Sequence, residues 1–276
     1  MKIFIVGLGL IGASYAEGLH KNGHVVYGYD QKIENIKQAI EIGFIEKENH
    51  IEQITKVDLI ILALYPKDNV IFIKNHVNLL RPGQMVTDVS GTKAWMMNEI
   101  EQILPEKISY TSHHPMAGKE TNGFESRDYR MFRQANFLIV TGKRSVKKDQ
   151  DILRLIANNL KFGKITVVDA KTHDELIAFT SQLTHVLAIS LVQSDHLDET
   201  KHATGDSYRD LTRIAKINET MWTELFFENK DALLLKINDF MKELKHVKEL
   251  LLVEDTESLT TYLKEAKEKR KSFDIH

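Results

Sequence analysis

Three glycines at fixed spacing near the start of the chain constrain its fold more than any other feature. Gly7-Leu8-Gly9-Leu10-Ile11-Gly12 follows the apolar run Lys2–Val6 and leads into an amphipathic stretch. In a strand–turn–helix unit the first glycine permits a tight turn, and the second lets a ligand approach the backbone. The third lets the helix pack closely on the strand. The pattern therefore predicts a βαβ unit whose helix N-terminus binds an anion.

An acidic residue at the end of the next apolar run makes this pattern more specific. Asp30 closes the segment VVYGYD, eighteen residues after Gly12. Its carboxylate can accept hydrogen bonds from the adenosine ribose and would repel a 2′-phosphate. Lys32 lies close enough to leave some NADP use open. We therefore predict a site for NAD, in preference to NADP, formed by Gly7, Leu8, Gly9, Leu10, Ile11, Gly12 and Asp30.

Strand-like and helical patterns alternate through the first 168 residues. Amphipathic stretches such as Gly12–His20 and Ile33–Ile42 separate short runs rich in β-branched residues. Such alternation predicts an α/β fold, with a mainly parallel, doubly wound sheet of Rossmann type. We expect strands at Lys2–Val6, His24–Tyr29, Asp58–Ala63, Met85–Asp88, Ile108–Thr111, Asn136–Val140 and Lys164–Val168.

The pattern changes after about Asp169, where strand signals stop and apolar residues recur at helical spacing. We therefore expect two domains: a dinucleotide-binding domain at 1–168 and an all-helical domain at 169–276 for substrate binding and dimerisation. The helical domain has apolar faces broad enough for dimer packing. Its expected helices are His173–His196, Tyr208–Ile217, Glu219–Val253 and Ser258–Lys271.

Composition excludes several classes of protein and of site. The 276 residues carry a formal net charge of −2 and no cysteine. This charge gives no reason to expect nucleic acid or an anionic membrane as partner. Disulfides and thiolate metal sites are impossible, no histidines stand at metal-ligand spacing, and a cytoplasmic location is expected. A signal peptide at the N-terminus is disfavoured, because its glycines would weaken the apolar helix. We expect no other apolar run long enough to span a bilayer.

Three further segments carry residues suited to chemistry. His114 lies in the segment SHHPMAGKE just after a predicted strand, where a loop would meet nicotinamide and substrate and a histidine could accept a hydroxyl proton. Ser181, Gln182 and His185 share one face of an otherwise apolar helix. Arg213 offers a planar fork for a carboxylate. From the residues alone, a surface histidine, a satisfied core histidine and a surface ion pair stay open as alternatives.

Together, the segments GLGLIG, HHPMAGKE, SQLTH and RDLTRIA with the later MW resemble the prephenate dehydrogenase family over essentially the whole chain. The resemblance implies a Rossmann domain joined to a dimerising helical domain. It also implies oxidative decarboxylation of prephenate to 4-hydroxyphenylpyruvate with NAD or NADP, in tyrosine biosynthesis. Some relatives carry a further C-terminal regulatory domain, which we do not expect in this chain.

The resemblance also implies roles for single residues. His114 matches the catalytic histidine that deprotonates the ring hydroxyl, and Arg213 matches the arginine that grips a prephenate carboxylate. The remaining matches are Ser181 and His185 in the substrate site, Trp222 in the pocket wall, and Glu120 with Asp210 as an ionic pair near the entrance.

The sequence departs from the family pattern at two points. The family usually shows D-x-G-S-x-K, with the serine beside the catalytic histidine, whereas this chain has Asp88-Val89-Ser90-Gly91-Thr92-Lys93. Ser90 is the natural substitute for that catalytic serine, although its hydroxyl can point differently. Gln182, which we also expect to contact substrate, stands where many members have histidine, so a charged role at that position is in doubt.

Alternative functions remain open at this stage. Arogenate dehydrogenase shares the fold and the chemistry, and the sequence does not separate the two substrates. A β-hydroxyacid dehydrogenase would need a lysine on the helix after the Rossmann domain, and His173–His196 contains none. A non-catalytic NAD-sensing module would not need both a base and a carboxylate clamp, and this sequence keeps both.

Overall fold

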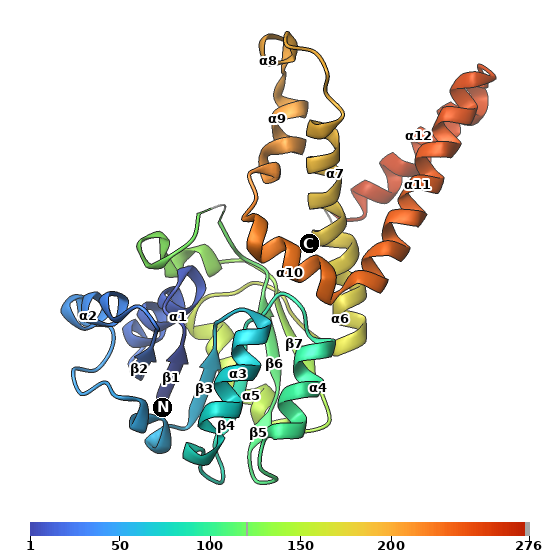
Figure 1. Ribbon diagram of the computed structural model, residues 1–276. Coiled ribbons are helices and arrows are strands. Elements are labelled where there is room, and N and C mark those ends of the chain that lie inside the picture. Colours follow the sequence, from blue (N-terminus) through green and yellow to red (C-terminus); the bar gives the residue numbers. More distant parts are fainter. Residues whose placement is uncertain (120, 274–276) are drawn as a thin grey trace. The chain divides into compact units, whose positions relative to one another are not determined.

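A parallel five-stranded sheet forms the first part of the molecule in the computed structural model, which describes residues 1–119 and 121–273. Its strand order is β2-β1-β3-β4-β5 (Figure 1). The order of the strands therefore reverses between β1 and β3, although all five strands are parallel. The predicted doubly wound α/β fold is confirmed. The strands are β1 (Lys2–Val6), β2 (Val25–Tyr29), β3 (Leu59–Leu62), β4 (Met85–Asp88) and β5 (Ser109–Tyr110).

Alternating side chains of β1 divide the core into two layers. Ile3 and Ile5 pack in one apolar cluster, while Phe4 and Val6 pack in the other. Successive residues of a strand point to opposite faces, so a strand buried on both faces is apolar throughout. Helices cover both faces. They are α1 (Leu10–Lys21), α2 (Ile33–Ile42), α3 (Pro66–His76), α4 (Ala94–Ile103) and α5 (Lys147–Asn159).

A second, three-stranded sheet departs from the sequence prediction. It consists of β6 (Ser112–Pro115), β7 (Phe137–Thr141) and β8 (Ile165–Asp169). β6 runs antiparallel to β7, with His114 opposite Leu138, and β7 runs parallel to β8. We expected a loop where β6 lies, and that expectation was wrong. The segment is polar and lacks strand signals, yet it pairs fully with the apolar β7.

The helical region begins directly after β8. α6 (Ala170–Ile177) continues through a π-helical turn at Ala178–Gln182 into α7 (Leu183–Gln193), nearly as one rod in Figure 1. The sequence predicted this run as a single helix. Shorter helices follow, namely α8 (Thr200–Ala203), α9 (Asp206–Thr212), a 3₁₀ turn at Arg213–Ala215, and α10 (Glu219–Glu228).

The long helix expected at Glu219–Val253 is interrupted at Asn229. α10 ends at Glu228, and the next helix begins at Lys230. The buried Asn229 side chain donates hydrogen bonds to the backbone oxygen of Asp174 and to Oε1 of Gln182, each over 2.8 Å. These two bonds hold the break in place, and apolar periodicity alone could not reveal it.

The chain divides into two compact units, Met1–Asn229 and Lys230–His276. In the second, α11 (Lys230–Leu252) packs against α12 (Thr256–Lys271), and Tyr262 donates a hydrogen bond to Glu243. The domain boundary expected between residues 168 and 169 remains a prediction.

One run, Ala170–Gln193, is long and apolar enough to cross a membrane by length and composition, contrary to our expectation of none. Two of its polar side chains instead make contacts within the first compact unit. Asp174 accepts hydrogen bonds from α4, and Gln182 donates one to the backbone of α10. We therefore interpret the run as a helix packed within the folded chain.

Candidate active site

The glycine segment forms a tight turn at the carboxyl end of β1. Gly7 has φ +93°, a backbone conformation that other residues rarely adopt. Its N–H donates to the Tyr29 carbonyl over 2.7 Å. A Cβ on Gly12 would lie 1.8 Å from the Gly7 carbonyl oxygen, so close helix–strand packing requires glycine there. The turn directs the start of α1 to the crevice where the strand order reverses, the usual ligand site of such sheets.

Gly9 marks where a ligand can approach the backbone. A Cβ built on it would meet nothing within 4 Å, and no side chain caps the N-terminus of α1. Uncapped N–H groups at the positive end of a helix suit a pyrophosphate. Asp30 lies beside this turn, where its carboxylate accepts hydrogen bonds from the N–H groups of Leu8 and Lys32. These residues fit the predicted dinucleotide.

Alanine substitutions should separate the two glycine roles. We expect Gly9→Ala to leave the melting temperature unchanged, because its methyl group enters open space, but to weaken NAD binding by about tenfold or more. Gly12→Ala should lower the stability by roughly 1–3 kcal/mol or more, because the methyl group overlaps the Gly7 carbonyl. Thermal denaturation and NAD titration of both variants check this. Unaltered NAD affinity in Gly9→Ala would contradict the assignment of the turn.

A buried ion pair lies beneath the next part of the site. Lys93 Nζ is 2.6 Å from Asp88 Oδ1, and neither side chain is exposed to solvent. Lys93 also donates to the backbone oxygen of His113 over 2.8 Å, and Tyr110 donates its hydroxyl to Asp88. Burial opposes ionisation of Asp88, but Lys93 and these hydrogen bonds hold its pKa below the usual value. The pair thus joins the end of β4 to β6.

His114, the predicted catalytic histidine, projects from β6 and contacts a second histidine. Its Nδ1 lies 2.9 Å from Nε2 of His173 on α6. His173 Nδ1 is 2.7 Å from Asp174 Oδ1. Asp174 also accepts hydrogen bonds from the backbone N–H groups of Lys93 and Ala94 at the start of α4. The structure therefore forms a hydrogen-bonded row from the carboxylate of Asp174 to His114.

The surroundings of His114 favour its neutral form. Burial, the neighbouring His173 and the ammonium of Lys93 all lower its pKa, to well below the ordinary value of 6.5. Burial likewise lowers the pKa of His173, against the opposing effect of Asp174. A neutral imidazole can accept a proton, as a general base must.

Ser90 is held away from this row. Its hydroxyl accepts a hydrogen bond from Asn69 over 3.0 Å and donates to the sulfur of Met96. No hydrogen bond joins Ser90 to His114 within residues 1–119 and 121–273. Gly91, at the position where the family pattern has serine, has no side chain to make one.

The π-helical turn realigns the face of the long helix. His185 stands twelve residues after His173, which in a regular α-helix of 3.6 residues per turn is about a third of a turn out of phase. A π turn takes up an extra residue and so returns His185 to roughly the face that carries His173. His185 Nδ1 lies 2.9 Å from the Ser181 carbonyl, and its ring centroid is 3.7 Å from that of Trp222. The structure thus brings three predicted substrate residues together.

Gln182 faces a different set of neighbours. It is 1% exposed, donates to the Leu225 carbonyl and accepts from Asn229. Both ends of its amide are therefore used to join the π turn to α10 and to the break that follows it.

Arg213, predicted to bind a carboxylate, and Asp210, predicted near the pocket entrance, are both exposed. Arg213 begins a 3₁₀ turn that packs against α7, the helix that carries His185. Asp210 is exposed on α9. Glu120 lies outside the described residues, so its expected pairing with Asp210 remains a prediction.

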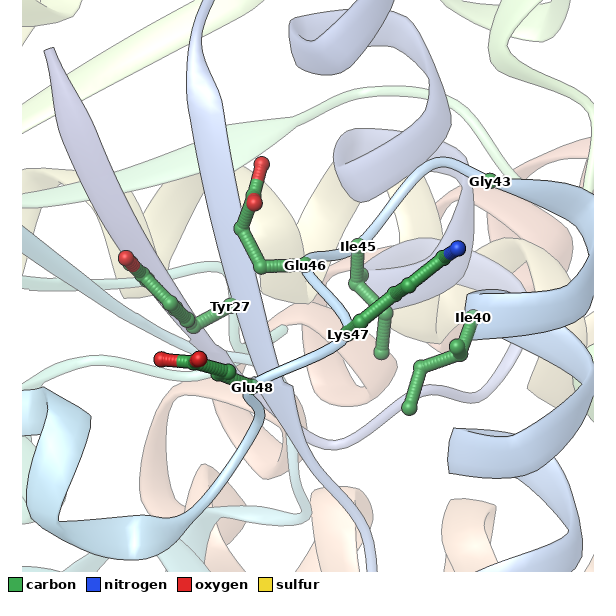
Figure 2. Close-up of a pocket in the computed structure, with 7 residues that line it drawn as sticks. All are labelled: Tyr27, Ile40, Gly43, Ile45, Glu46, Lys47 and Glu48. Atoms are coloured by element: carbon green, nitrogen blue, oxygen red, sulfur yellow. The ribbon is translucent and has the colours of Figure 1, made fainter.

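A hollow near the end of α2 contains none of the predicted site residues. Figure 2 shows Tyr27 and Glu48 side by side in it, with Lys47 directed away from them. Its lining residues are Tyr27, Ile40, Gly43, Ile45, Glu46, Lys47 and Glu48.

Comparison with known families matches both parts of the chain. The family described as prephenate dehydrogenase, nucleotide-binding domain, matches residues 15–168, and prephenate dehydrogenase, dimerization domain, matches residues 169–265. The chain belongs to the prephenate dehydrogenase family. The resemblance inferred from the sequence motifs is thereby confirmed.

Individual relatives agree with this family. The chain is 29% identical to prephenate dehydrogenase of Lactococcus lactis subsp. cremoris over 100% of this chain and 78% of that protein. It is 28% identical to prephenate dehydrogenase of Bacillus subtilis over 97% and 75%. A crystal structure of A. aeolicus prephenate dehydrogenase, in complex with hydroxyphenyl propionate and NAD+, superposes with a TM-score of 0.88. The two sequences are 29% identical, and the superposition covers 99% of this chain and 98% of the A. aeolicus chain.

Sequence reasoning missed His173 and Asp174, which complete the row to His114. A His-Asp pair at the start of an otherwise apolar helix was the available signal. It was overlooked because the contact with His114 spans 59 positions and depends on β6, which was predicted as a loop.

Proposed function

We propose that this protein catalyses the oxidative decarboxylation of prephenate to 4-hydroxyphenylpyruvate with NAD, and that His114 is the general base. The observation that carries the proposal is that His114 hydrogen-bonds to His173 in an environment that lowers its pKa and so favours the neutral form, in a chain of this family. The A. aeolicus relative with hydroxyphenyl propionate and NAD+ supports the choice of ligands. Prephenate becomes aromatic on losing carbon dioxide, so much of the driving force lies in the substrate.

Each group of residues has a separate role in this reaction. The turn Gly7–Gly12 and Asp30 bind the dinucleotide, whose nicotinamide accepts the hydride when bound. His114 Nε2 takes the proton of the ring hydroxyl. Arg213 binds a substrate carboxylate, and Ser181, His185 and Trp222 line the substrate pocket. We assign structural roles to Ser90 and Gln182, because their polar atoms are bonded within the protein, Ser90 to two side chains and Gln182 to the backbone of α10.

We also propose a cytoplasmic homodimer joined through the helical region. The match to a dimerization domain at residues 169–265 supports this assembly. Large apolar side chains that are exposed on α11 supply suitable surface, for example Leu235, Met241 and Leu244.

Initial rates with two substrates test the proposed function. Prephenate and arogenate differ only in the side chain, which carries a ketone or an amine. NADH formation should be faster with prephenate than with arogenate at equal concentrations, and faster with NAD than with NADP. Turnover of arogenate alone would replace the proposed substrate, and turnover of neither would overturn the proposal.

The pH profile should reflect the lowered pKa of His114. The base acts in its neutral form, so activity is lost only as the pH falls through the pKa of the free enzyme. Because burial, His173 and Lys93 lower that pKa, kcat/KM should stay level through neutral pH and decline at a pH well below 6.5. Measurement of kcat/KM across the acid range checks this. A decline that begins above pH 6.5 would contradict the assigned environment.

A further inference from the structure

We propose that His173 and Asp174 are positioning residues that fix His114 in the tautomer with its proton on Nδ1 and its lone pair on Nε2. The inference rests on the proposed role of His114 as base. It concerns two residues that no sequence motif singled out.

The direction of each hydrogen bond follows from the Asp174 carboxylate. An ionised carboxylate only accepts hydrogen bonds, and Asp174 already accepts two from backbone N–H groups at the start of α4. The 2.7 Å contact with His173 Nδ1 therefore requires a proton on that nitrogen. A neutral His173 then has its lone pair on Nε2 and can only accept there. Across the 2.9 Å contact, His114 must donate from Nδ1.

This leaves His114 Nε2 unprotonated, which is the form that a base requires. Within residues 1–119 and 121–273, no group hydrogen-bonds to this nitrogen, and the His114 side chain is only partly buried. The hydrogen bonds from Asp174 through His173 thus leave the lone pair of His114 Nε2 unused by the protein, so that a substrate can reach it.

The same row can accommodate the charge that forms during reaction. When Nε2 accepts the substrate hydroxyl proton, the O–H bond breaks and His114 becomes an imidazolium. Lys93 opposes this positive charge, whereas the Asp174 carboxylate, acting through His173, favours it.

Asp174→Asn tests the direction of the row. The amide can donate to His173 Nδ1, which would move the His173 proton to Nε2 and reverse the His114 tautomer. We expect kcat to fall by about 10²–10⁴-fold, as in comparable carboxylate–histidine pairs, with KM changing much less. The single variant His173→Gln should instead retain much of the wild-type activity, because the side-chain carbonyl oxygen of glutamine can still accept a hydrogen bond from His114 Nδ1.

Nitrogen-15 NMR of histidine-labelled protein reads the tautomer without turnover. We expect Nδ1–H on His114 in the wild type and Nε2–H in Asp174→Asn. Asp149→Asn is the matched control, since Asp149 is also a buried carboxylate and accepts from Ser109 and Thr111. It should leave the tautomer unchanged.

An Nε2–H tautomer in the wild type would overturn the inference even if prephenate is turned over. If Asp174→Asn does not fold, the wild-type spectrum and His173→Gln kinetics still decide. Failure of the proposed function would instead appear as absent prephenate turnover, with the wild-type tautomer unaffected.

Discussion

Replacing His114 with asparagine should lower kcat by about 10²–10⁴-fold, the usual contribution of a positioned general base. Asparagine keeps a polar side chain of similar size but cannot accept the hydroxyl proton at neutral pH. KM for prephenate and the affinity for NAD should change little, because neither depends on proton transfer. Steady-state kinetics and NAD titration measure both quantities.

His20→Asn is a suitable control for this substitution. His20 is exposed at the C-terminal end of α1, at the opposite end of that helix from the glycine turn. Its variant should match the wild type in kcat and KM. If His114→Asn retained wild-type turnover, His114 could not be the base.

Replacing Lys93 with methionine should lower the free energy of unfolding by about 3–5 kcal/mol, because it leaves the Asp88 carboxylate buried without its partner. Methionine retains the apolar volume of the lysine stem, so the loss reports the charge and the contact with the His113 carbonyl. Burial would then raise the pKa of Asp88. The variant should therefore regain stability relative to the wild type as the pH falls, since its folded state now binds a proton more tightly.

Denaturant unfolding checks this result against two comparisons. Lys74→Met removes a solvent-exposed ion pair with Glu99 at 3.8 Å and should cost about 1 kcal/mol or less. Lys93→Met combined with Asp88→Asn should be more stable than Lys93→Met alone, because no buried charge remains. Equal losses in Lys93→Met and Lys74→Met would show that the buried pair is not a major determinant of stability.

Much of the fold follows from local patterns. The glycine turn and the apolar strands β1 and β3 have unambiguous signals, because both faces of these two strands are buried. β6 has none: its buried positions are filled by Ser112 and His113, and His113 is stabilised by hydrogen bonds to Thr87 and Tyr15. Such long-range polar contacts leave no periodic pattern, and the strand was predicted as a loop.

The candidate site shows the same limit. His114 and Arg213 could be singled out through family motifs, but the bonds of Ser90 to Asn69 and Met96 could not. The π turn was also hidden, because apolar periodicity does not register a single extra residue. The sequence thus predicts which residues carry the chemistry, whereas their tautomers and hydrogen-bond partners depend on elements brought together by folding.

The most direct test of the proposed activity mixes the protein with NAD and prephenate and follows NADH and carbon dioxide in the same sample. Oxidative decarboxylation predicts equimolar formation of both by the wild type and almost none by His114→Asn. NADH formed without carbon dioxide would indicate a simple alcohol dehydrogenation and would contradict the account.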